Sequence, residues 1–253
     1  MKIGFIVKFL LFFIIATLLT ALLAYLLGAI ELPTFHTEQV SASFMPKYTT
    51  VIIDAGHGGE DGGASSASGL VEKDVNLEIS TMLCDMLRAN GVNVIITRED
   101  DRLLYDRNVD FKGRKKKLDL AARLALADST PDAIFVSIHM NSFTTPKYSG
   151  LQVWYSPNNA DSMVLADMIQ EENREMLQSN NNRITSKATS AIFLLHNAKC
   201  PAVLVECGFL SNPDEAELFE SYEYRKKVAF MLLCSITEFL NTVENQSSDY
   251  SVN

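Results

Sequence analysis

The 253-residue chain lacks the motifs of nucleotide binding, although it has a glycine-rich loop where such a motif would stand. Five glycines fall within ten residues after the apolar run Val51–Ile53. A dinucleotide fingerprint counted from Gly56 would need a glycine at position 61, which is Asp61, and a P-loop would need a lysine well before Lys73. The adjacent acids Glu60 and Asp61 would also repel a phosphate. The loop is therefore interpreted as presenting its histidine to a positive or polar group.

The chain also lacks an excess of positive charge. Its 22 Lys and Arg residues are outnumbered by 31 Asp and Glu residues, which gives a formal net charge of −9. This balance argues against nucleic-acid binding, which needs clustered positive charge. The one basic cluster is "KGRKKK" at residues 112–117. It is either a solvated helix face or a site of attraction to an anionic polymer or lipid headgroups.

Cysteine is scarce and is not arranged for metal binding. None of the four cysteines forms a C-x-x-C pair or a zinc-ribbon spacing, and each stands among apolar residues. We expect them to be small buried hydrophobic residues. Cys207 is not interpreted as a nucleophile, because no histidine lies near it in the sequence. The four residues are Cys84, Cys200, Cys207 and Cys234.

Charge is absent from one long stretch, Phe9–Ile30, which is about 22 residues and long enough to span a bilayer. Lys2 and Lys8 precede it and Glu31 follows, so the positive-inside rule keeps the N-terminus in the cytoplasm. The alternative is a cleaved signal peptide, but its apolar region is normally shorter and no convincing cleavage site follows. The sequence predicts a membrane-anchored protein with its folded domain outside the cytoplasm, or a secreted one if the segment is cleaved.

Four parts of the chain follow from composition and patterning. Residues 1–30 are the expected anchor or signal segment, and the mixed, Ser- and Thr-containing stretch 31–47 is the expected linker. Residues 48–243 carry the apolar runs of a folded domain of ordinary size. Residues 244–253 contain too few apolar side chains to pack and are expected to be a disordered tail.

Short apolar runs alternate with helical patterns through the folded domain. The expected strands are Tyr48–Asp54, Val92–Arg98, Ala133–Ile138, Leu151–Ser156 and Ala202–Leu210. The expected helices cover 72–91, 114–128 and 160–178, with one beginning at Pro213 and a long one ending near Val243, and the polar stretch 178–187 is an expected loop. This alternation predicts an α/β fold, a three-layer α/β/α arrangement with a mostly parallel or mixed sheet of about six strands.

In such sheets chemistry gathers where strands end at their carboxyl edge. Three residues stand there: His57 after the first strand, His139 after "AIFVSI" and Glu206 after "AVLV". Glu72 lies about one loop beyond His57, at the start of an expected helix. Two imidazoles and one such carboxylate that converge from separate loops form a typical catalytic zinc set, with a fourth position left for water. Alone, either histidine could be a hydrogen-bonded structural residue. Spacing leaves the third ligand open among Glu72, Glu60, Asp61 and Asp54, and Glu72 near a helix start could simply favour the helix dipole.

Glu206 is anomalous because it interrupts the apolar run "AVLVECGFL". Burying an unpaired carboxylate costs several kcal/mol, so this position needs a cation, a hydrogen-bond network or a function. One interpretation is a salt bridge to an arginine or lysine. The other is an acid/base role beside a metal-bound water, in which Glu206 takes a proton and delivers it to a leaving nitrogen.

The segments "DAGHGGEDGG", "EKDVNL", "TR", "SIHMNS" and "VECGFLSNPDE" occur in this order between Thr50 and about Leu240. They resemble the motifs of the zinc-dependent N-acetylmuramoyl-L-alanine amidases of the third amidase family. The resemblance implies that His57, Glu72 and His139 bind zinc, that Glu206 is the catalytic acid/base, and that residues 48–243 are the catalytic domain. Asn141, in "SIHMNS", is a candidate substrate-binding residue. One departure is Ala55, where the family usually has proline.

The implied reaction is hydrolysis of the amide between the lactyl group of N-acetylmuramic acid and the first L-alanine of the stem peptide. The short layout, without wall-binding repeats, is similar to the germination-specific amidases of spore-forming bacteria. That similarity implies a role in spore cortex maturation through muramic-δ-lactam formation. The implied partners are peptidoglycan, the cytoplasmic membrane and a protein activator. The alternatives are a zinc peptidase acting on the stem peptide and a non-catalytic peptidoglycan-binding domain.

Overall fold

The computed structural model describes residues 3–29, 46–106, 108 and 112–249. The chain divides into two compact units, 1–44 and 45–253, each of which is described by itself. In the first unit the helix α1 (Ile3–Ala29) covers most of the predicted anchor or signal segment. Within the described residues, no helix qualifies as a membrane span. Most of the predicted linker, residues 31–45, lies outside the described part of the chain.

The second unit is built on a six-stranded mixed sheet with the order β2-β1-β3-β6-β4-β5. The first four strands in this order run parallel to one another, β4 is antiparallel to β6, and β5 is parallel to β4. The prediction of a mostly parallel or mixed sheet of about six strands is therefore confirmed. The strands are β1 (Thr50–Ala55), β2 (Asn93–Ile96), β3 (Ala133–Asn141), β4 (Gln152–Tyr155), β5 (Ser186–Lys187) and β6 (Ala202–Phe209).

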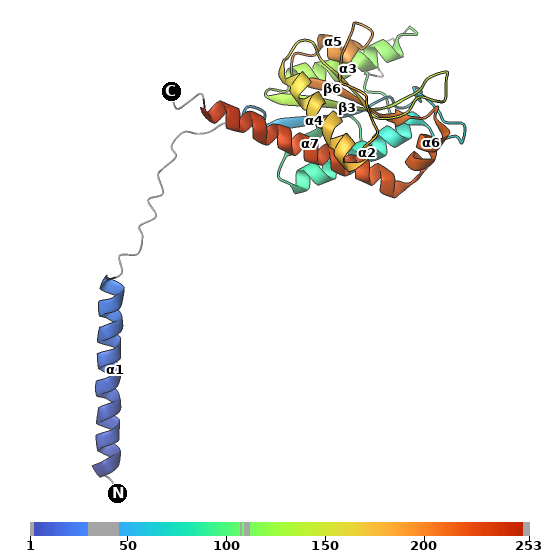
Figure 1. Cartoon of the computed structure of the whole chain (residues 1–253). Helices are drawn as coiled ribbons and strands as arrows, with labels where there is room; N and C mark the ends of the chain where they lie inside the picture. The colour runs from blue at the N-terminus through green and yellow to red at the C-terminus, as the bar shows by residue number, and fades with distance from the viewer. Residues whose placement is uncertain (1–2, 30–45, 107, 109–111, 250–253) are drawn as a thin grey trace. The chain divides into compact units, whose positions relative to one another are not determined.

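Helices cover both faces of this sheet and complete the three layers (Figure 1). The larger core cluster joins residues of α2, α4 and α7 to one face, and the smaller cluster joins α3 and α5 to the other. The helices are α2 (Glu72–Ala89), α3 (Lys115–Ser129), α4 (Asp161–Met176), α5 (Phe193–Asn197), α6 (Pro213–Glu220) and α7 (Tyr222–Asp249).

Strand alternation decides which side chains meet at the carboxyl edge of the sheet, because neighbouring residues of a strand point to opposite faces. Along β3, Ile138 belongs to the larger core and Phe135 to the smaller one. His139 therefore points to the α3 and α5 face. Along β6, Leu204 belongs to the smaller core, which places Glu206 on the same face.

Three local features differ from the sequence prediction. Lys187 and its neighbour form the edge strand β5 inside the predicted 178–187 loop, and the short helix α5 was not predicted. Both elements are too short to carry a periodic hydrophobic pattern. The predicted helix end near Val243 is wrong, because α7 continues to Asp249 through part of the predicted tail. No glycine or proline stands between these two positions to stop the helix. Residues 250–253 lie outside the described part.

Candidate metal centre

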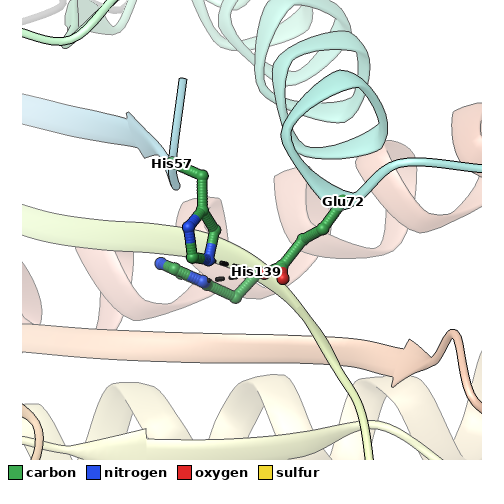
Figure 2. A group of neighbouring side chains, drawn as sticks. All are labelled: His57, Glu72 and His139. Atoms are coloured by element: carbon green, nitrogen blue, oxygen red, sulfur yellow. Dashed lines mark hydrogen bonds and ion pairs between the residues drawn. The ribbon is translucent and has the colours of Figure 1, made fainter. Parts of the chain in front are cut away.

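Three side chains from separate elements converge at the carboxyl edge of the sheet (Figure 2). His57 stands in the loop after β1, Glu72 is the first residue of α2, and His139 lies near the end of β3. Glu72 Oε1 is 3.2 Å from His57 Nε2 and 3.0 Å from His139 Nδ1. One ligand atom from each residue lies within 4.8 Å of the others. The structure thus brings together the two predicted histidines and one of the four candidate acids.

The glycines of the loop leave space for this convergence. A Cβ atom on Gly56 would lie 2.3 Å from His139 Nε2, and one on Gly63 would lie 2.4 Å from Glu72 Oε2. Real Cβ atoms essentially never approach another atom so closely. His57 itself has φ 60, a left-handed conformation that is uncommon for a residue with a side chain. The glycine-rich sequence therefore serves the packing of the three side chains rather than the binding of a phosphate.

The carboxylate of Glu72 is fixed by backbone donors. Ala64 N donates to its Oε2 at 2.7 Å, and Met140 N donates to its Oε1 at 3.0 Å. Burial opposes ionisation, but the contacts with His139 and His57 outweigh it and hold the pKa of Glu72 well below its usual range. An ionised, immobilised carboxylate between two imidazoles is a suitable ligand for a divalent cation.

Asp54 is committed elsewhere and does not join this group. It is fully buried beneath the site, where Thr97 Oγ1 donates to its Oδ1 at 2.8 Å and Ser137 Oγ donates to its Oδ2 at 2.6 Å. The guanidinium of Arg123 pairs with the same carboxylate. Burial alone would raise the pKa of Asp54, but Arg123 and Ser137 outweigh it and lower the pKa.

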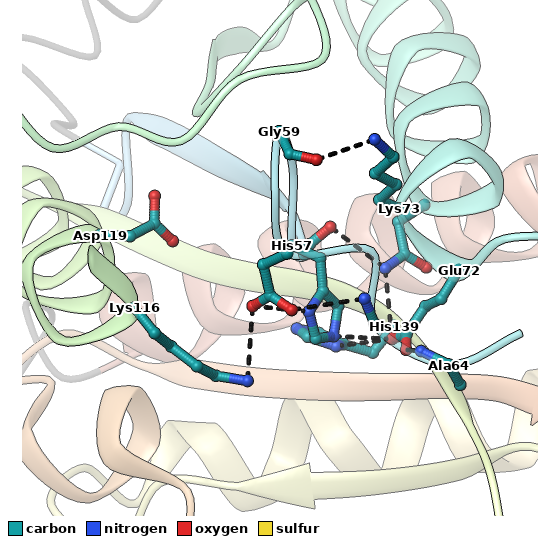
Figure 3. Close-up of polar contacts among 12 residues, drawn as sticks. His57, Gly59, Ala64, Glu72, Lys73, Lys116, Asp119 and His139 are labelled. Carbon is teal, nitrogen blue, oxygen red and sulfur yellow. Dashed lines mark hydrogen bonds and ion pairs between the residues drawn. The ribbon is translucent and has the colours of Figure 1, made fainter. Parts of the chain in front are cut away.

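The two acids of the glycine-rich loop pair with the basic cluster 112–117. Lys115 Nζ donates to Glu60 Oε1 at 2.6 Å, and Lys116 Nζ lies 3.4 Å from Asp61 Oδ2. Two lysines of the cluster thus face the acids of the loop, and Figure 3 shows Lys116 directed toward it. Neither of the two interpretations of the cluster, a solvated face or attraction to an anionic surface, included this pairing.

Asp61 also contacts the outer side of the His57 ring. Its Oδ2 lies 3.0 Å from His57 Nδ1, the ring nitrogen that faces away from Glu72. Burial would lower the pKa of His57, but the contacts with Glu72 and Asp61 raise it. A carboxylate on the outer nitrogen fixes the orientation of a metal-binding histidine, and such partners tune metal affinity.

Glu206 lies beside the group rather than in it. It is the register partner of His139 in the parallel pairing of β3 and β6, and Gln152 faces it from β4. Its Oε2 is buried and has no hydrogen-bond partner in the described structure. Burial raises the pKa of Glu206 to about 7. No salt bridge to Glu206 occurs among the described residues. The alternative interpretation, a salt bridge to an arginine or lysine, is therefore not supported in this part of the chain.

Asn141 ends β3 and joins the edge of β6 through its backbone. Its carbonyl oxygen accepts a hydrogen bond from Leu210 N at 2.9 Å, while its side-chain Oδ1 accepts one from Ser142 N at 2.8 Å. The half-buried side chain thus stays at the carboxyl edge of the sheet, one residue beyond Met140.

Two buried arginines support the site without a role having been predicted for them, although Arg98 belongs to the motif segment "TR". Arg98 and Arg123 are each about 1% exposed, and both donate to backbone carbonyls of the segment that carries His57. A signal was available for each. Arg98 stands two residues after the end of β2, as His57 stands two residues after the end of β1, and Arg123 stands four residues after Asp119 on α3.

The donor atoms suit a transition metal. Two imidazole nitrogens and a carboxylate oxygen on three rigid elements match the three-ligand zinc sites of hydrolases, and the nearby unpartnered Glu206 Oε2 leaves an acceptor for water or substrate. A backbone hydrogen bond holds the Glu72 carboxylate, and the missing side chains of Gly56 and Gly63 leave room for His139 and Glu72. The residues present therefore fit a bound metal ion.

Comparison with known proteins agrees with this chemistry. Residues 51–238 match the model of the family described as N-acetylmuramoyl-L-alanine amidase. The chain is 36% identical over 189 residues to the germination-specific N-acetylmuramoyl-L-alanine amidase of Bacillus subtilis strain 168, covering 75% of this chain and 78% of the relative.

Two solved structures are similar over the same domain. One is the CwlD amidase of Clostridioides difficile in complex with the GerS lipoprotein, with a TM-score of 0.72 and 38% identity, covering 77% of this chain and 99% of that one. The other is an N-acetylmuramoyl-L-alanine amidase of Clostridium difficile 630, with a TM-score of 0.66 and 28% identity, covering 77% and 98%.

Proposed function

The chain belongs to the N-acetylmuramoyl-L-alanine amidase family, and from this premise we propose which of its residues perform the reaction and with which metal. It is an N-acetylmuramoyl-L-alanine amidase that acts on peptidoglycan, as the motifs in its sequence predict. The bond cleaved joins the lactyl group of N-acetylmuramic acid to L-alanine. We propose that the metal is zinc and that its ligands are His57, Glu72 and His139.

The convergence of these three side chains is the observation that carries the proposal. When bound, zinc supplies a Lewis acid that polarises a carbonyl group and lowers the pKa of a coordinated water. The protein's own contribution is to present the three donor atoms in a fixed arrangement. Ala64 and Met140 hold the Glu72 carboxylate through their backbone N–H groups, and the Asp61 carboxylate lies 3.0 Å from His57 Nδ1.

Glu206 is the proposed acid/base. Its pKa of about 7 lets the carboxyl group accept a proton and release it again near neutral pH. Amide hydrolysis needs both steps, because the attacking water must lose a proton and the leaving nitrogen must gain one. The register pairing of Glu206 with His139, a proposed ligand, supports this role. We also propose that Asn141, at the same edge of the sheet, contacts the substrate.

We propose spore cortex maturation as the biological role. The support is the likeness to a relative named as germination-specific and to the CwlD amidase. Because the CwlD amidase was solved in complex with a lipoprotein, a protein partner that acts as activator is proposed for this chain as well. Recovery of such a partner from sporulating cells with the full chain as bait tests this part of the proposal.

Peptidoglycan lies outside the cytoplasmic membrane, so the site of action is extracytoplasmic. We propose that the uncharged stretch Phe9–Ile30 holds the protein at that membrane, and the support is the sequence alone. Fractionation of cells that produce the full chain tests this, because carbonate extraction releases a peripheral protein and a secreted one appears in the medium.

End-group chemistry tests the reaction and the metal together. Peptidoglycan is digested with the full chain, and newly freed α-amino groups of L-alanine are assayed with and without a chelator. Zinc-dependent release is expected from the wild type. A stem-peptide peptidase would free other amino groups, and a binding domain would free none.

A matched pair of histidine variants tests the ligand assignment. His139→Ala is expected to lose bound zinc and activity, whereas His196→Ala, at an exposed position on α5, is expected to keep both. A His139→Ala protein that retains stoichiometric zinc would overturn the proposed site.

A further inference from the structure

Arg98 occupies an unusual position for an arginine. It stands two residues after the end of β2 and is about 1% exposed. Burial lowers its pKa, with a further contribution from the nearby Arg123. In the described structure no carboxylate forms a salt bridge with its guanidinium. Its partners are instead four backbone carbonyl oxygens.

These carbonyls belong to segments that carry two proposed metal ligands. Arg98 Nε donates to Ala55 O and Nη2 donates to Gly56 O, both at 2.9 Å, directly before His57. Nη2 also donates to Lys73 O at 2.7 Å, directly after Glu72. A fourth bond, from Nη1 to Asp100 O at 3.2 Å, holds the arginine's own loop. One side chain therefore joins the backbone beside His57 to the backbone beside Glu72.

The far end of the ligand loop has its own connection to α2. Glu72 N donates to Ala64 O at 2.9 Å, and Lys73 N donates to Gly62 O at 3.1 Å. These two bonds fix residues 62–64, but they do not reach the residues before His57. On that near side the helix is held by Arg98 and by Asn76 Nδ2, which donates to Gly56 O at the longer distance of 3.3 Å.

Arg123 shows the contrast. It donates to Ala55 O at 2.8 Å and to His57 O at 2.7 Å, but its other partners are the carboxylates of Asp54 and Asp119. It therefore ties the loop to β1 and α3 and makes no hydrogen bond with α2. Of the two buried arginines, only Arg98 donates both to the segment before His57 and to the first turn of α2.

We propose that Arg98 is a positioning residue that sets the metal affinity of the site by clamping the His57 loop to the first turn of α2. This inference rests on the proposed assignment of His57 and Glu72 as ligands. The ligand atoms must stay a fixed short distance apart to hold an ion, and a clamp on the backbone of both segments removes freedom that binding would otherwise have to remove.

A lysine cannot replace this clamp. The planar guanidinium offers five N–H donors in a fixed fork, whereas an ammonium group offers three donors from a single nitrogen. Arg98→Lys keeps the positive charge and most of the buried stem but loses simultaneous contact with Ala55, Gly56 and Lys73. The substitution therefore separates positioning from charge.

The test is a zinc titration of the full chain against a chromophoric chelator, with the melting temperature of the metal-free protein measured in parallel. Arg98→Lys is expected to bind zinc about 10- to 100-fold more weakly, the range for residues that support metal ligands. It is also expected to change the visible spectrum of the Co²⁺-substituted protein. The control is Arg88→Lys, a partly exposed arginine of α2 that lies away from the site. Unchanged zinc affinity with only a lower melting temperature would show a merely structural role and overturn the inference.

The same titration separates failure of the inference from failure of the proposed function. If His139→Ala keeps its zinc, the ligand assignment itself is wrong. If His139→Ala loses zinc while Arg98→Lys keeps the wild-type affinity, only the role of Arg98 is wrong.

A measurement on the wild type covers the case in which Arg98→Lys does not fold. Coupling is reciprocal, so a clamp that favours metal binding must itself be tightened by bound metal. Zinc is expected to slow hydrogen exchange at the Arg98 Nε–H, followed by NMR, and to leave that of Arg88 unchanged. An exchange rate at Arg98 that does not respond to zinc would overturn the proposal.

Discussion

His139 and Glu206 face each other as register partners in the parallel strands β3 and β6. Neighbouring strands lie about 4.8 Å apart, and paired residues of parallel strands point to the same face. A proposed metal ligand and the proposed acid/base therefore stand side by side on one rigid sheet. The pairing of the two strands therefore fixes the distance between the His139 ring and the Glu206 carboxyl group.

Replacement of Glu206 should separate catalysis from metal binding. Glu206→Gln keeps the shape of the side chain but removes its proton-accepting carboxylate, so we expect bound zinc to be retained and amide hydrolysis to fall by at least 100-fold. Zinc content and release of L-alanine amino groups are measured on the same preparation. Glu217→Gln, on the exposed surface of α6, is the control. A fully active Glu206→Gln protein would exclude the acid/base role.

The same substitution should stabilise the metal-free protein at alkaline pH. The folded-state pKa of Glu206, about 7, lies above the ordinary value of 4.5. Above pH 7 the ionised carboxylate therefore lowers the free energy of unfolding by its full amount. This penalty decreases as the pH falls and is absent below about 4.5. We expect Glu206→Gln to raise the free energy of unfolding by about 2 kcal/mol at pH 8 and by progressively less toward pH 5. Urea unfolding at both pH values measures this, and an equal change at both would contradict the buried-carboxylate explanation.

The pH profile of activity follows from the same group. A general base must be ionised, so kcat/KM should fall as the pH drops below about 7, where Glu206 becomes protonated. Loss of metal at lower pH adds to this decline, because metal ligands must be unprotonated. Zinc content measured alongside the rate distinguishes the two causes. A rate that stays constant down to pH 5.5 would count against both assignments.

Gly63 and Gly69 offer a matched test of the space at the site. Both have positive φ, +69 and +94, but a Cβ on Gly63 would meet Glu72 Oε2 at 2.4 Å, whereas one on Gly69 would meet nothing within 4 Å. Each alanine substitution should cost about 1–2 kcal/mol for its backbone conformation. Only Gly63→Ala should also weaken zinc binding, by at least 10-fold, because it displaces the carboxylate. Equal zinc affinities in the two variants would show that the clearance is unimportant.

Asp54 should be a stability residue rather than a ligand. It is fully buried and its carboxylate pairs with Arg123, which is about 1% exposed. Asp54→Ala leaves a buried guanidinium without this partner, and we expect it to cost about 3–5 kcal/mol in thermal or urea unfolding. Glu60→Ala, which removes an exposed partner of Lys115, should change stability little. A small effect of Asp54→Ala would mean that water or Asp119 compensates the charge.

Much of the fold was predictable because local patterns of apolar residues indicate its strands and helices. Val51–Ile53 and Ala133–Ile138 are apolar runs of strand length, and the helix between Glu72 and Ala89 has a clear amphipathic period. The elements that escaped prediction, β5 and α5, have two and five residues and form because longer neighbours support them. The extension of α7 to Asp249 was missed because polar residues were interpreted as a tail although nothing among them stops a helix.

The sequence by itself determined the chemistry of this protein: two histidines and a glutamate at strand ends, a glycine-rich loop beside one of them, and the order of the amidase motifs. The motif resemblance implied Glu72, but residue spacing left open which acid joins the histidines, and only the tertiary structure shows the contact. Spacing does not distinguish Glu72 from Glu60, Asp61 and Asp54. In the folded chain Glu72 contacts both rings, whereas Glu60 pairs with Lys115, Asp61 lies at the outer nitrogen of His57, and Asp54 pairs with Arg123. Ligand geometry depends on contacts between residues distant in the chain, and a local pattern carries no information about them.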